Sequence, residues 1–223
     1  MGNTKISQTE ENYLKAIFKI NESTGKSAGN KAISNAMDTS AASVTDMLRR
    51  LAKKELIHYE SHRGVTLTNA GSSIATNLIR KHRLWEVFLV DKLQFAWDEV
   101  HPIAEELEHI KSAKLIAQLD EFLGYPKFDP HGDPIPDVEG NFTFRQQILL
   151  SDVEVGKQGM LVGVQEHSKD FLQYLDGLKL GLGTVVEVLE RFTYDESVRL
   201  RINNSAVVVL SQKVSQNLFI KFV

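Results

Sequence analysis

The stretch NKAISNAMDTSAASVTDMLRRLAKKELIHYESHRGVTLT, residues 30–68, decides the fold of the N-terminal part of the chain. It begins with two sets of apolar residues at helical spacing, and residues 38–40 between them supply a turn and an N-cap for the second helix. Two short β-rich runs follow around residues 61–64, which indicates a hairpin. Residues 9–23 add an earlier amphipathic helix. This order of helix, helix, turn, helix and hairpin predicts a winged helix-turn-helix.

The composition is that of a globular protein, with 42% hydrophobic and 25% charged residues among 223. Cysteine is absent, which excludes disulfides, thiolate metal ligands and cysteine nucleophiles. No apolar run approaches the ~20 residues that span a bilayer, so we expect a cytoplasmic protein with no membrane contact. Residues 1–72 carry ten Lys and Arg against seven Asp and Glu, whereas residues 73–140 carry seven against thirteen. This asymmetry favours an anionic partner for the first part and cations for the second.

Three domains are predicted, which makes the chain an α+β multidomain protein. Residues 1–72 form the winged helix-turn-helix, and residues 73–140 form a helical domain whose several apolar faces predict dimerisation. Four of the five prolines lie in residues 124–140, which predicts a rigid connection. Residues 141–223 contain five short β-rich runs and one short helix, which is typical of a small five-stranded barrel.

The segment HPIAEELEH, residues 101–109, holds two of the seven histidines and three glutamates. If the segment is helical, the side chains at spacings i, i+4, i+7 and i+8 share one face. They are His101, Glu105, Glu108 and His109. Imidazole and carboxylate groups without thiolate suit Mn²⁺ or Fe²⁺, and they also accept Zn²⁺ or Co²⁺. A solvated acidic helix face is the alternative.

A second pair favours the metal interpretation. His82 and Glu86 lie four residues apart in the preceding long helix, so they share a face. Alone, such a pair indicates only a weak contact along a helix. Packed against the first group, it would bring together about five or six nitrogen and oxygen donors, enough for one or two metal ions.

The third predicted helix carries small and hydroxyl-bearing residues at its start and arginines further along. Small residues allow close approach to base edges, and arginines reach phosphates. A lysine in the second helix and an arginine at the wing tip add charge near the DNA backbone. An ordinary solvated face is the alternative, which the surrounding helix-turn-helix pattern disfavours. The predicted DNA-binding residues are Lys31, Ser40, Ala42, Ser43, Thr45, Asp46, Arg49, Arg50 and Arg63.

Enzyme signatures are missing from the sequence, which has no glycine-rich phosphate loop, no GxSxG nucleophile elbow after a predicted strand, and no HExxH motif. We therefore expect neither catalysis nor a small-molecule substrate. The alternatives to a metal-dependent DNA-binding protein are a winged-helix regulator of an organic ligand, a small metalloenzyme, and a metal-storage or scaffold protein that does not bind DNA.

Several segments, in order along nearly the whole chain, resemble the diphtheria-toxin-repressor and manganese-transport-regulator (DtxR/MntR) family. They are YLKAIFKI, SVTDMLRRLAKKELIHYESHRGVTLTNAG, RKHRLWEVFL, the H-x3-E-x2-E-H segment, PHGDPIP and FLQYLDGLKLG. The resemblance implies a homodimeric repressor that binds double-stranded operator DNA of metal-uptake genes when Mn²⁺ or Fe²⁺ is bound. It also implies two metal sites per chain and a C-terminal SH3-like (FeoA-like) β-barrel.

The primary metal site of the family joins the N-terminal helix to the dimerisation helix. The matching residues here are Asn12, Glu105, Glu108 and His109. The carboxylate of Glu105 resembles the manganese-type members, because iron-type members have a sulfur ligand at that position. Asn12 departs from the methionine or aspartate usual in the family. Its carbonyl oxygen can ligate weakly, Glu10 or Glu11 can replace it, or the contact runs through water.

The ancillary site of the family is the second site that the resemblance implies. It matches His82, Glu86 and His101, completed by residues of the C-terminal domain, for which His167 and Asp170 are the candidates. Some members instead recruit a Cys-Pro-His segment, which is Asp129-Pro130-His131 here, so Asp129 and His131 are further candidates. The alternatives are a turn histidine between prolines for His131 and a surface-loop residue for His167.

Overall fold

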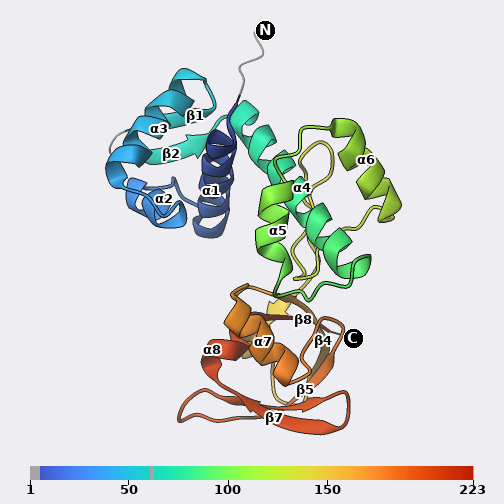
Figure 1. Cartoon of the computed structure of the whole chain (residues 1–223). Helices are drawn as coiled ribbons and strands as arrows, with labels where there is room; N and C mark the ends of the chain where they lie inside the picture. Colours follow the sequence, from blue (N-terminus) through green and yellow to red (C-terminus); the bar gives the residue numbers. More distant parts are fainter. Residues whose placement is uncertain (1–5, 61–62, 223) are drawn as a thin grey trace. The chain divides into compact units, whose positions relative to one another are not determined.

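The computed structural model describes residues 6–60 and 63–222 (Figure 1). The chain divides into two compact units. The first comprises residues 1–82, 107–112 and 136–142, and the second comprises residues 83–106, 113–135 and 143–223. The division falls within one continuous helix, α4 (Asn69–Asp91), which contributes residues to both units. Among the described residues, no helix is both long and apolar enough to cross a membrane.

The first unit contains the predicted winged helix-turn-helix. Its elements are α1 (Gln8–Thr24), α2 (Asn30–Ala36), α3 (Ala41–Lys53), β1 (Ile57–Glu60) and β2 (Gly64–Leu67). The two strands pair antiparallel, with Ile57 opposite Leu67 and Glu60 opposite Gly64. The predicted hairpin is therefore present, although residues 61–62 of its turn lie outside the described residues.

Local sequence signals set the ends of these helices. The Ser7 hydroxyl accepts the Glu10 backbone N–H, and the Glu10 carboxylate accepts the Ser7 N–H, which forms a capping box at the start of α1. Gly25 ends α1 in the left-handed conformation that glycine favours, with a φ of 64°. Ser40 caps α3 as predicted, because its hydroxyl accepts the Ser43 N–H.

An aliphatic core holds the three helices and the hairpin together. Burying each such side chain contributes about 1.5–3 kcal/mol, so these contacts fix how α3 sits against α2 and β1. The opposite face of α3 stays exposed. The fully buried side chains of this core include Leu14, Ile17, Ile33, Val44, Leu48, Leu51 and Val65.

The second unit contains two further helices and an antiparallel sheet. The helices are α5 (Val100–Leu107) and α6 (Ala113–Phe122). The six strands lie in the order β3-β8-β4-β5-β6-β7. Their bounds are β3 (Ile148–Leu149), β4 (Gln158–Val164), β5 (Val185–Arg191), β6 (Val198–Ile202), β7 (Ala206–Leu210) and β8 (Leu218–Phe222). The 3-10 helix η1 (Leu150–Asp152) and the helices α7 (Lys169–Gly177) and α8 (Gln212–Ser215) complete the unit.

The prediction of five strands is wrong by one. The additional strand, β3, has only two residues, and so short a run shows no alternation of apolar and polar residues. The other five strands are present where predicted. Their inward side chains, including Leu161, Val188 and Leu200, form a core together with Leu172 and Leu175 of α7.

Candidate metal centre

The histidine- and glutamate-rich segment of residues 101–109 does not stay helical. α5 ends at Leu107, where a hydrogen bond from the Ile110 N–H to the Leu107 carbonyl tightens the turn. Glu108 and His109 lie in this turn, so the predicted single helical face for the four donors is wrong. Their environments differ as well. The side chains of His101 and Glu105 are 44% and 46% exposed, whereas those of Glu108 and His109 are 1% and 8% exposed.

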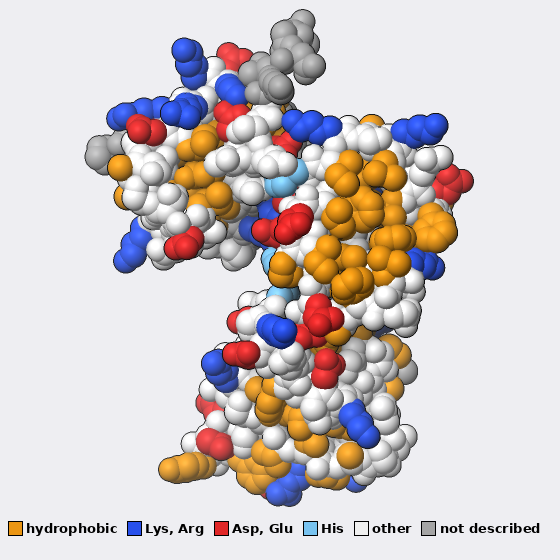
Figure 2. Space-filling model, in the orientation of Figure 1, with side chains coloured by type: hydrophobic (Ala, Val, Ile, Leu, Met, Phe, Trp, Pro, Cys, Tyr) orange, Lys and Arg blue, Asp and Glu red, His pale blue; other side chains and the backbone are white. Residues whose placement is uncertain are grey.

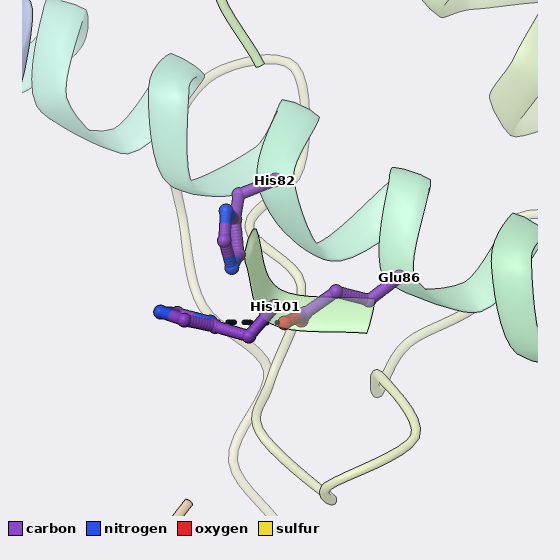
Figure 3. Close-up of side chains that lie close together, drawn as sticks. All are labelled: His82, Glu86 and His101. Atoms are coloured by element: carbon purple, nitrogen blue, oxygen red, sulfur yellow. Dashed lines mark hydrogen bonds and ion pairs between the residues drawn. The ribbon is translucent and has the colours of Figure 1, made fainter. Parts of the chain in front are cut away.

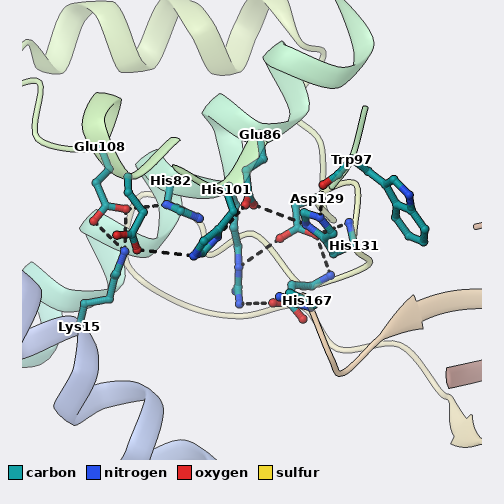
Figure 4. Close-up of polar contacts among 12 residues, drawn as sticks. Lys15, His82, Glu86, Trp97, His101, Glu108, Asp129, His131 and His167 are labelled. Atoms are coloured by element: carbon teal, nitrogen blue, oxygen red, sulfur yellow. Dashed lines mark hydrogen bonds and ion pairs between the residues drawn. The ribbon is translucent and has the colours of Figure 1, made fainter. Parts of the chain in front are cut away.

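The carboxylate of Glu108 is held from two sides in the first unit. Lys15 of α1 donates from Nζ to Oε1 at 2.7 Å and to Oε2 at 2.8 Å (Figure 4). His82 of α4 has its Nδ1 2.6 Å from Oε2. Burial raises the pKa of Glu108, but the His82 hydrogen bond and the Lys15 charge outweigh it and hold that pKa below its ordinary value. Glu108 is therefore a buried anion.

His109 contacts α1. Its Nδ1 lies 2.7 Å from Oε2 of Glu11, and its Nε2 lies 3.9 Å from Oε1 of Glu108. Of the two glutamates that could replace Asn12, Glu11 is therefore the one beside His109. Glu10 caps α1 and pairs with Lys54 at 2.7 Å instead. We call Glu11, Lys15, His82, Glu108 and His109 the Glu108 group.

Asn12 follows Glu11 in α1 and keeps an unsatisfied oxygen. Its Oδ1 is buried and has no hydrogen-bond partner within residues 6–60 and 63–222. Leaving a buried amide oxygen unpaired costs free energy unless a ligand or an ordered water satisfies it. Carboxylate, imidazole and amide oxygen donors together fit a divalent metal ion.

A second set of donors surrounds Glu86 in the second unit. Oε1 of Glu86 lies 3.3 Å from Nδ1 of His101, and Oε2 lies 3.9 Å from Nδ1 of His131. Figure 3 shows the contact with His101, and it shows His82 one helical turn before Glu86 on α4. The predicted spacing of His82 and Glu86 along one helix is therefore present. We call Glu86, His101, Asp129 and His131 the Glu86 group.

Asp129 is a second buried carboxylate of this group. Its Oδ1 accepts the backbone N–H groups of His131 and Asp133 at 2.9 and 3.0 Å, and its Oδ2 lies 3.4 Å from Nε of Arg83. Burial raises the pKa of Asp129 well above its ordinary value, and the charges of Glu86 and Asp133 raise it further against the effect of Arg83. A cation placed between the buried carboxylates would relieve their repulsion.

His131 has a defined orientation. Its Nε2 lies 2.8 Å from the backbone oxygen of Trp97, which can only accept, so Nε2 carries the hydrogen. In the neutral ring, Nδ1 is then an acceptor. This nitrogen lies 3.9 Å from Oε2 of Glu86, and one ring nitrogen of His131 and one oxygen each of Glu86 and Asp129 lie within 4.8 Å of one another. A ring N–H held by a carbonyl, with the other nitrogen facing carboxylates, is the usual arrangement of a metal-binding histidine.

The two candidate ligands from the C-terminal domain, His167 and Asp170, differ in burial and in their neighbours. The ring of His167 stacks on that of His131 with centroids 4.8 Å apart, and burial lowers the pKa of His167. Its Nε2 lies 3.2 Å from the carbonyl oxygen of Val164. Asp170 lies in the first turn of α7 and is exposed. The structure therefore brings His167, but not Asp170, to the side of a Glu86-group residue.

The predicted DNA-binding residues lie in α2, in α3 with its N-cap, and in the wing. Eight of the nine are exposed. The exception is Thr45, whose half-buried hydroxyl donates to the Ala41 carbonyl and accepts from the Asn30 amide. Arg49 pairs with Asp46 at 3.6 Å and Arg63 with Glu60 at 3.2 Å, and both are exposed ion pairs. Exposed pairs contribute little to stability, so both arginines can exchange these partners for phosphate.

Comparisons with known proteins identify the family of the chain. Three sequence-family models match consecutive parts of the chain: iron dependent repressor, N-terminal DNA binding domain (residues 5–65); iron dependent repressor, metal binding and dimerisation domain (residues 68–137); and FeoA domain (residues 148–221). The chain belongs to the DtxR/MntR family of metal-dependent transcriptional repressors. The resemblance inferred from the sequence motifs is thereby confirmed.

Individual members of the DtxR/MntR family match to different extents. A solved structure of a manganese-dependent transcriptional repressor in complex with manganese is 31% identical, has a TM-score of 0.85, and matches 96% of this chain and 100% of that chain. The iron-dependent repressor IdeR of Mycobacterium leprae is 33% identical over 77% of this chain and 78% of its own length. IdeR of Mycobacterium tuberculosis is 33% identical over 59% of this chain, a match that spans only 57% of its length.

Three residues at the candidate sites of this DtxR/MntR member were missed from the sequence. Lys15 pairs with Glu108, Arg83 contacts Asp129, and the Trp97 carbonyl fixes the His131 ring. Lys15 lies four residues after Glu11, a spacing that also occurs in ordinary helical ion pairs, so the sequence offers no specific signal for it. Arg83 follows His82 directly and could have been noticed as a counter-charge.

Proposed function

We propose that this chain represses transcription by binding operator DNA as a homodimer once Mn²⁺ is bound. The observation that carries the proposal is the Glu108 group, in which α1 and the turn after α5 bring nitrogen and oxygen donors together. Because α1 belongs to the winged helix-turn-helix, a metal ion held by both segments would fix the DNA-binding domain onto the helical domain. The domain boundaries proposed are residues 1–72, 73–140 and 141–223.

The proposed primary site uses donors from α1, from α5 and from the turn that follows α5. Its ligands are Asn12, Glu105, Glu108 and His109, with Glu11 as a further donor from α1. The buried, unpaired Oδ1 of Asn12 supports a direct contact from the amide oxygen. A donor set of carboxylate, imidazole and amide groups without sulfur favours Mn²⁺ over metals that prefer thiolate.

The proposed second site is centred on Glu86. Its candidate ligands are His82, Glu86, His101, Asp129, His131 and His167, and Asp170 stays a candidate from the sequence alone. The acceptor Nδ1 of His131 and the two buried carboxylates support a cation at this place. Two sites per chain are therefore proposed, both built from nitrogen and oxygen donors.

The mechanism follows from where the donors sit in the chain. A bound divalent cation supplies the positive charge that the buried carboxylates share. Glu11 and Asn12 would hold the cation from α1, and Glu108 and His109 would hold it from the turn after α5. Coordination by both segments would restrain α1. In the dimer, that restraint favours the arrangement in which the two α3 helices enter successive major grooves. A coupling of about 1–3 kcal/mol would change operator affinity about 5–150-fold.

An exposed apolar surface supports the homodimer. Figure 2 shows a broad hydrophobic area over the part of the second unit that contains α4, α5 and α6. Contiguous exposed apolar surface of this kind marks protein interfaces. Large hydrophobic side chains that are exposed in this part of the chain include Leu93, Leu115, Phe122 and Tyr125.

The first experiment tests the metal-dependent repressor itself. Duplexes would be selected from a random-sequence library by full-length protein, and the affinity for the selected duplex measured with Mn²⁺ and with EDTA. We expect at least about fivefold tighter binding with Mn²⁺, from the coupling range above. Equal affinity in the two conditions would contradict a metal-activated repressor.

A second experiment tests the Glu86 site. The substitution Glu86→Gln removes the carboxylate common to every proposed version of that site, and Glu121→Gln on the exposed surface of α6 is the matched control. Dialysis followed by metal analysis should give two Mn²⁺ per chain for the control and one for Glu86→Gln. An unchanged ratio in Glu86→Gln would rule out a site centred on Glu86.

A further inference from the structure

The ammonium group of Lys15 binds the carboxylate of Glu108 in the proposed primary site. Lys15 lies on the inward face of α1 and is 7% exposed. Its ammonium nitrogen is almost equidistant from the two oxygens of Glu108, at 2.7 and 2.8 Å (Figure 4). A metal ion bound by both oxygens of a carboxylate takes this same position between them. The ammonium and the metal ion therefore compete for one place.

The Lys15–Glu108 pair differs from an ordinary surface ion pair. The two side chains are 9% and 1% exposed, so water screens their attraction little. Lys15 also has a flexible stem and a compact charge, which allows the ammonium to leave Glu108 without moving the backbone of α1. The ammonium of Lys15 therefore holds the Glu108 carboxylate, and another cation can still replace it.

We propose that Lys15 is a tethered cation that holds Glu108 in the metal-free protein and sets the Mn²⁺ concentration to which the protein responds. The inference rests on the proposed function, because it takes Glu108 as a metal ligand. Lys15 neutralises this carboxylate before metal arrives, and it repels an incoming cation. Affinity for Mn²⁺ is therefore lower than the same donors would give beside a neutral side chain.

The position of Lys15 in α1 has a second effect. Glu11 and Lys15 lie four residues apart, so they project from the same side of the helix. Before metal binds, α1 reaches the turn after α5 through the Lys15–Glu108 pair as well as the Glu11–His109 contact. Metal binding would then replace the Lys15–Glu108 pair by coordination of the ion from α1. The response to metal depends on the difference in free energy between these two ways of holding α1.

The test measures Mn²⁺ binding without DNA. Metal-free full-length protein would be titrated with MnCl₂ by isothermal titration calorimetry, for the natural chain and for Lys15→Met, Lys15→Gln and Lys15→Arg. Met and Gln remove the charge and end one atom short of the lysine ammonium, and Arg keeps the charge. We expect the two neutral variants to bind Mn²⁺ about tenfold more tightly or better, because a like charge is removed from beside the ion.

The arginine variant should stay within about threefold of the natural chain, since it keeps the competing charge. If Lys15→Met does not fold without metal, Lys15→Gln carries the test, because its amide can still donate to Glu108. Neutral variants that bind Mn²⁺ no more tightly than the natural chain would overturn the proposal and leave Lys15 a structural ion-pair partner.

The outcome separates this inference from the proposed function. If the natural chain binds no Mn²⁺, or binds DNA equally well without it, the proposed function fails. If the natural chain responds to Mn²⁺ but the neutral variants bind it no more tightly, only the role of Lys15 fails. With both ideas correct, the Mn²⁺ concentration for half-maximal DNA binding is lower in the neutral variants.

Discussion

Glu106 and Glu108 lie two residues apart, but their surroundings have nothing in common. Glu106 is an exposed residue of α5, whereas Glu108 is buried in the following turn with Lys15 and His82 against its carboxylate. A charge in water needs no partner, but a buried charge depends on its partners for stability. The same side chain therefore has different consequences at the two positions.

The substitution Glu108→Gln should weaken both stability and metal binding. It leaves the Lys15 ammonium buried without its counter-charge, which typically costs about 3–5 kcal/mol. Urea denaturation of the metal-free protein measures this loss, and calorimetry should show Mn²⁺ affinity at the primary site falling at least about tenfold. Glu106→Gln is the control and should change neither quantity. Equal stability of the two variants would contradict the buried ion pair.

At the scale of elements, α3 is the helix proposed to contact DNA. Arg50 is exposed near its C-terminal end, on the side away from the aliphatic core. Arg50→Ala should weaken binding about equally for different duplexes and reduce the slope of log affinity against log salt by about 1, because one phosphate contact is lost. Fluorescence anisotropy at several salt concentrations measures the slope. Lys157→Ala, which removes an exposed charge before β4, should leave that slope unchanged.

The loop of residues 129–133 is the element that positions Asp129 and His131. It is attached to β4, because the Val164 N–H donates to the His131 carbonyl and Arg145 donates to the carbonyls of Gly132 and Val162. Gly132 has a φ of 91°, and a Cβ there would overlap the Val162 carbonyl oxygen. This turn therefore has space only for glycine.

Gly132→Ala should consequently destabilise the protein and disturb the second metal site. Strain at a positive φ costs about 1–3 kcal/mol, and the overlap with β4 adds to it. Thermal unfolding and the Mn²⁺ ratio by dialysis are the measurements. Gly181→Ala is the matched control, since a Cβ there meets no atom within 4 Å among the described residues. A Gly132→Ala protein as stable as this control would mean that the loop does not rest on β4 as described.

The sequence predicts an element well when the interactions that determine it join residues close together in the chain. The winged helix-turn-helix was predicted because Ser40 and the hairpin signal act within a few residues. The end of α5 was not predicted, since no glycine or proline follows Leu107 in that segment. The pairing of Lys15 with Glu108 spans 93 residues, so no local pattern contains it. The candidate metal donors were recognised as residue types, and the family resemblance divided them between two sites. The contact of His82 with Glu108 was not predicted, because it joins residues 26 positions apart in the chain.

For the whole molecule, the proposed homodimer would join two DNA-binding domains. Phe122 is 63% exposed near the end of α6, within the apolar area proposed as the interface. Phe122→Glu should weaken the dimer, because it would bury an unpaired charge. Sedimentation velocity across a range of concentrations should show monomer where the natural chain is dimeric. Tyr194→Glu, at a 99% exposed position, should remain dimeric. A fully dimeric Phe122→Glu protein would place the interface elsewhere.

The stacking of Trp97 on His131 offers an optical signal. Their ring centroids lie 6.0 Å apart with planes at 12°, and the chain has one other tryptophan, Trp85. Mn²⁺ is paramagnetic and quenches the emission of an aromatic ring close to it. In a Trp85→Phe protein, Trp97 emission should therefore fall as the Glu86 site fills and recover with EDTA. If the Trp97 emission does not change with Mn²⁺ while calorimetry records two bound ions, the second ion binds away from His131. The fluorescence of a single natural side chain can thus distinguish the filling of one metal site from that of the other.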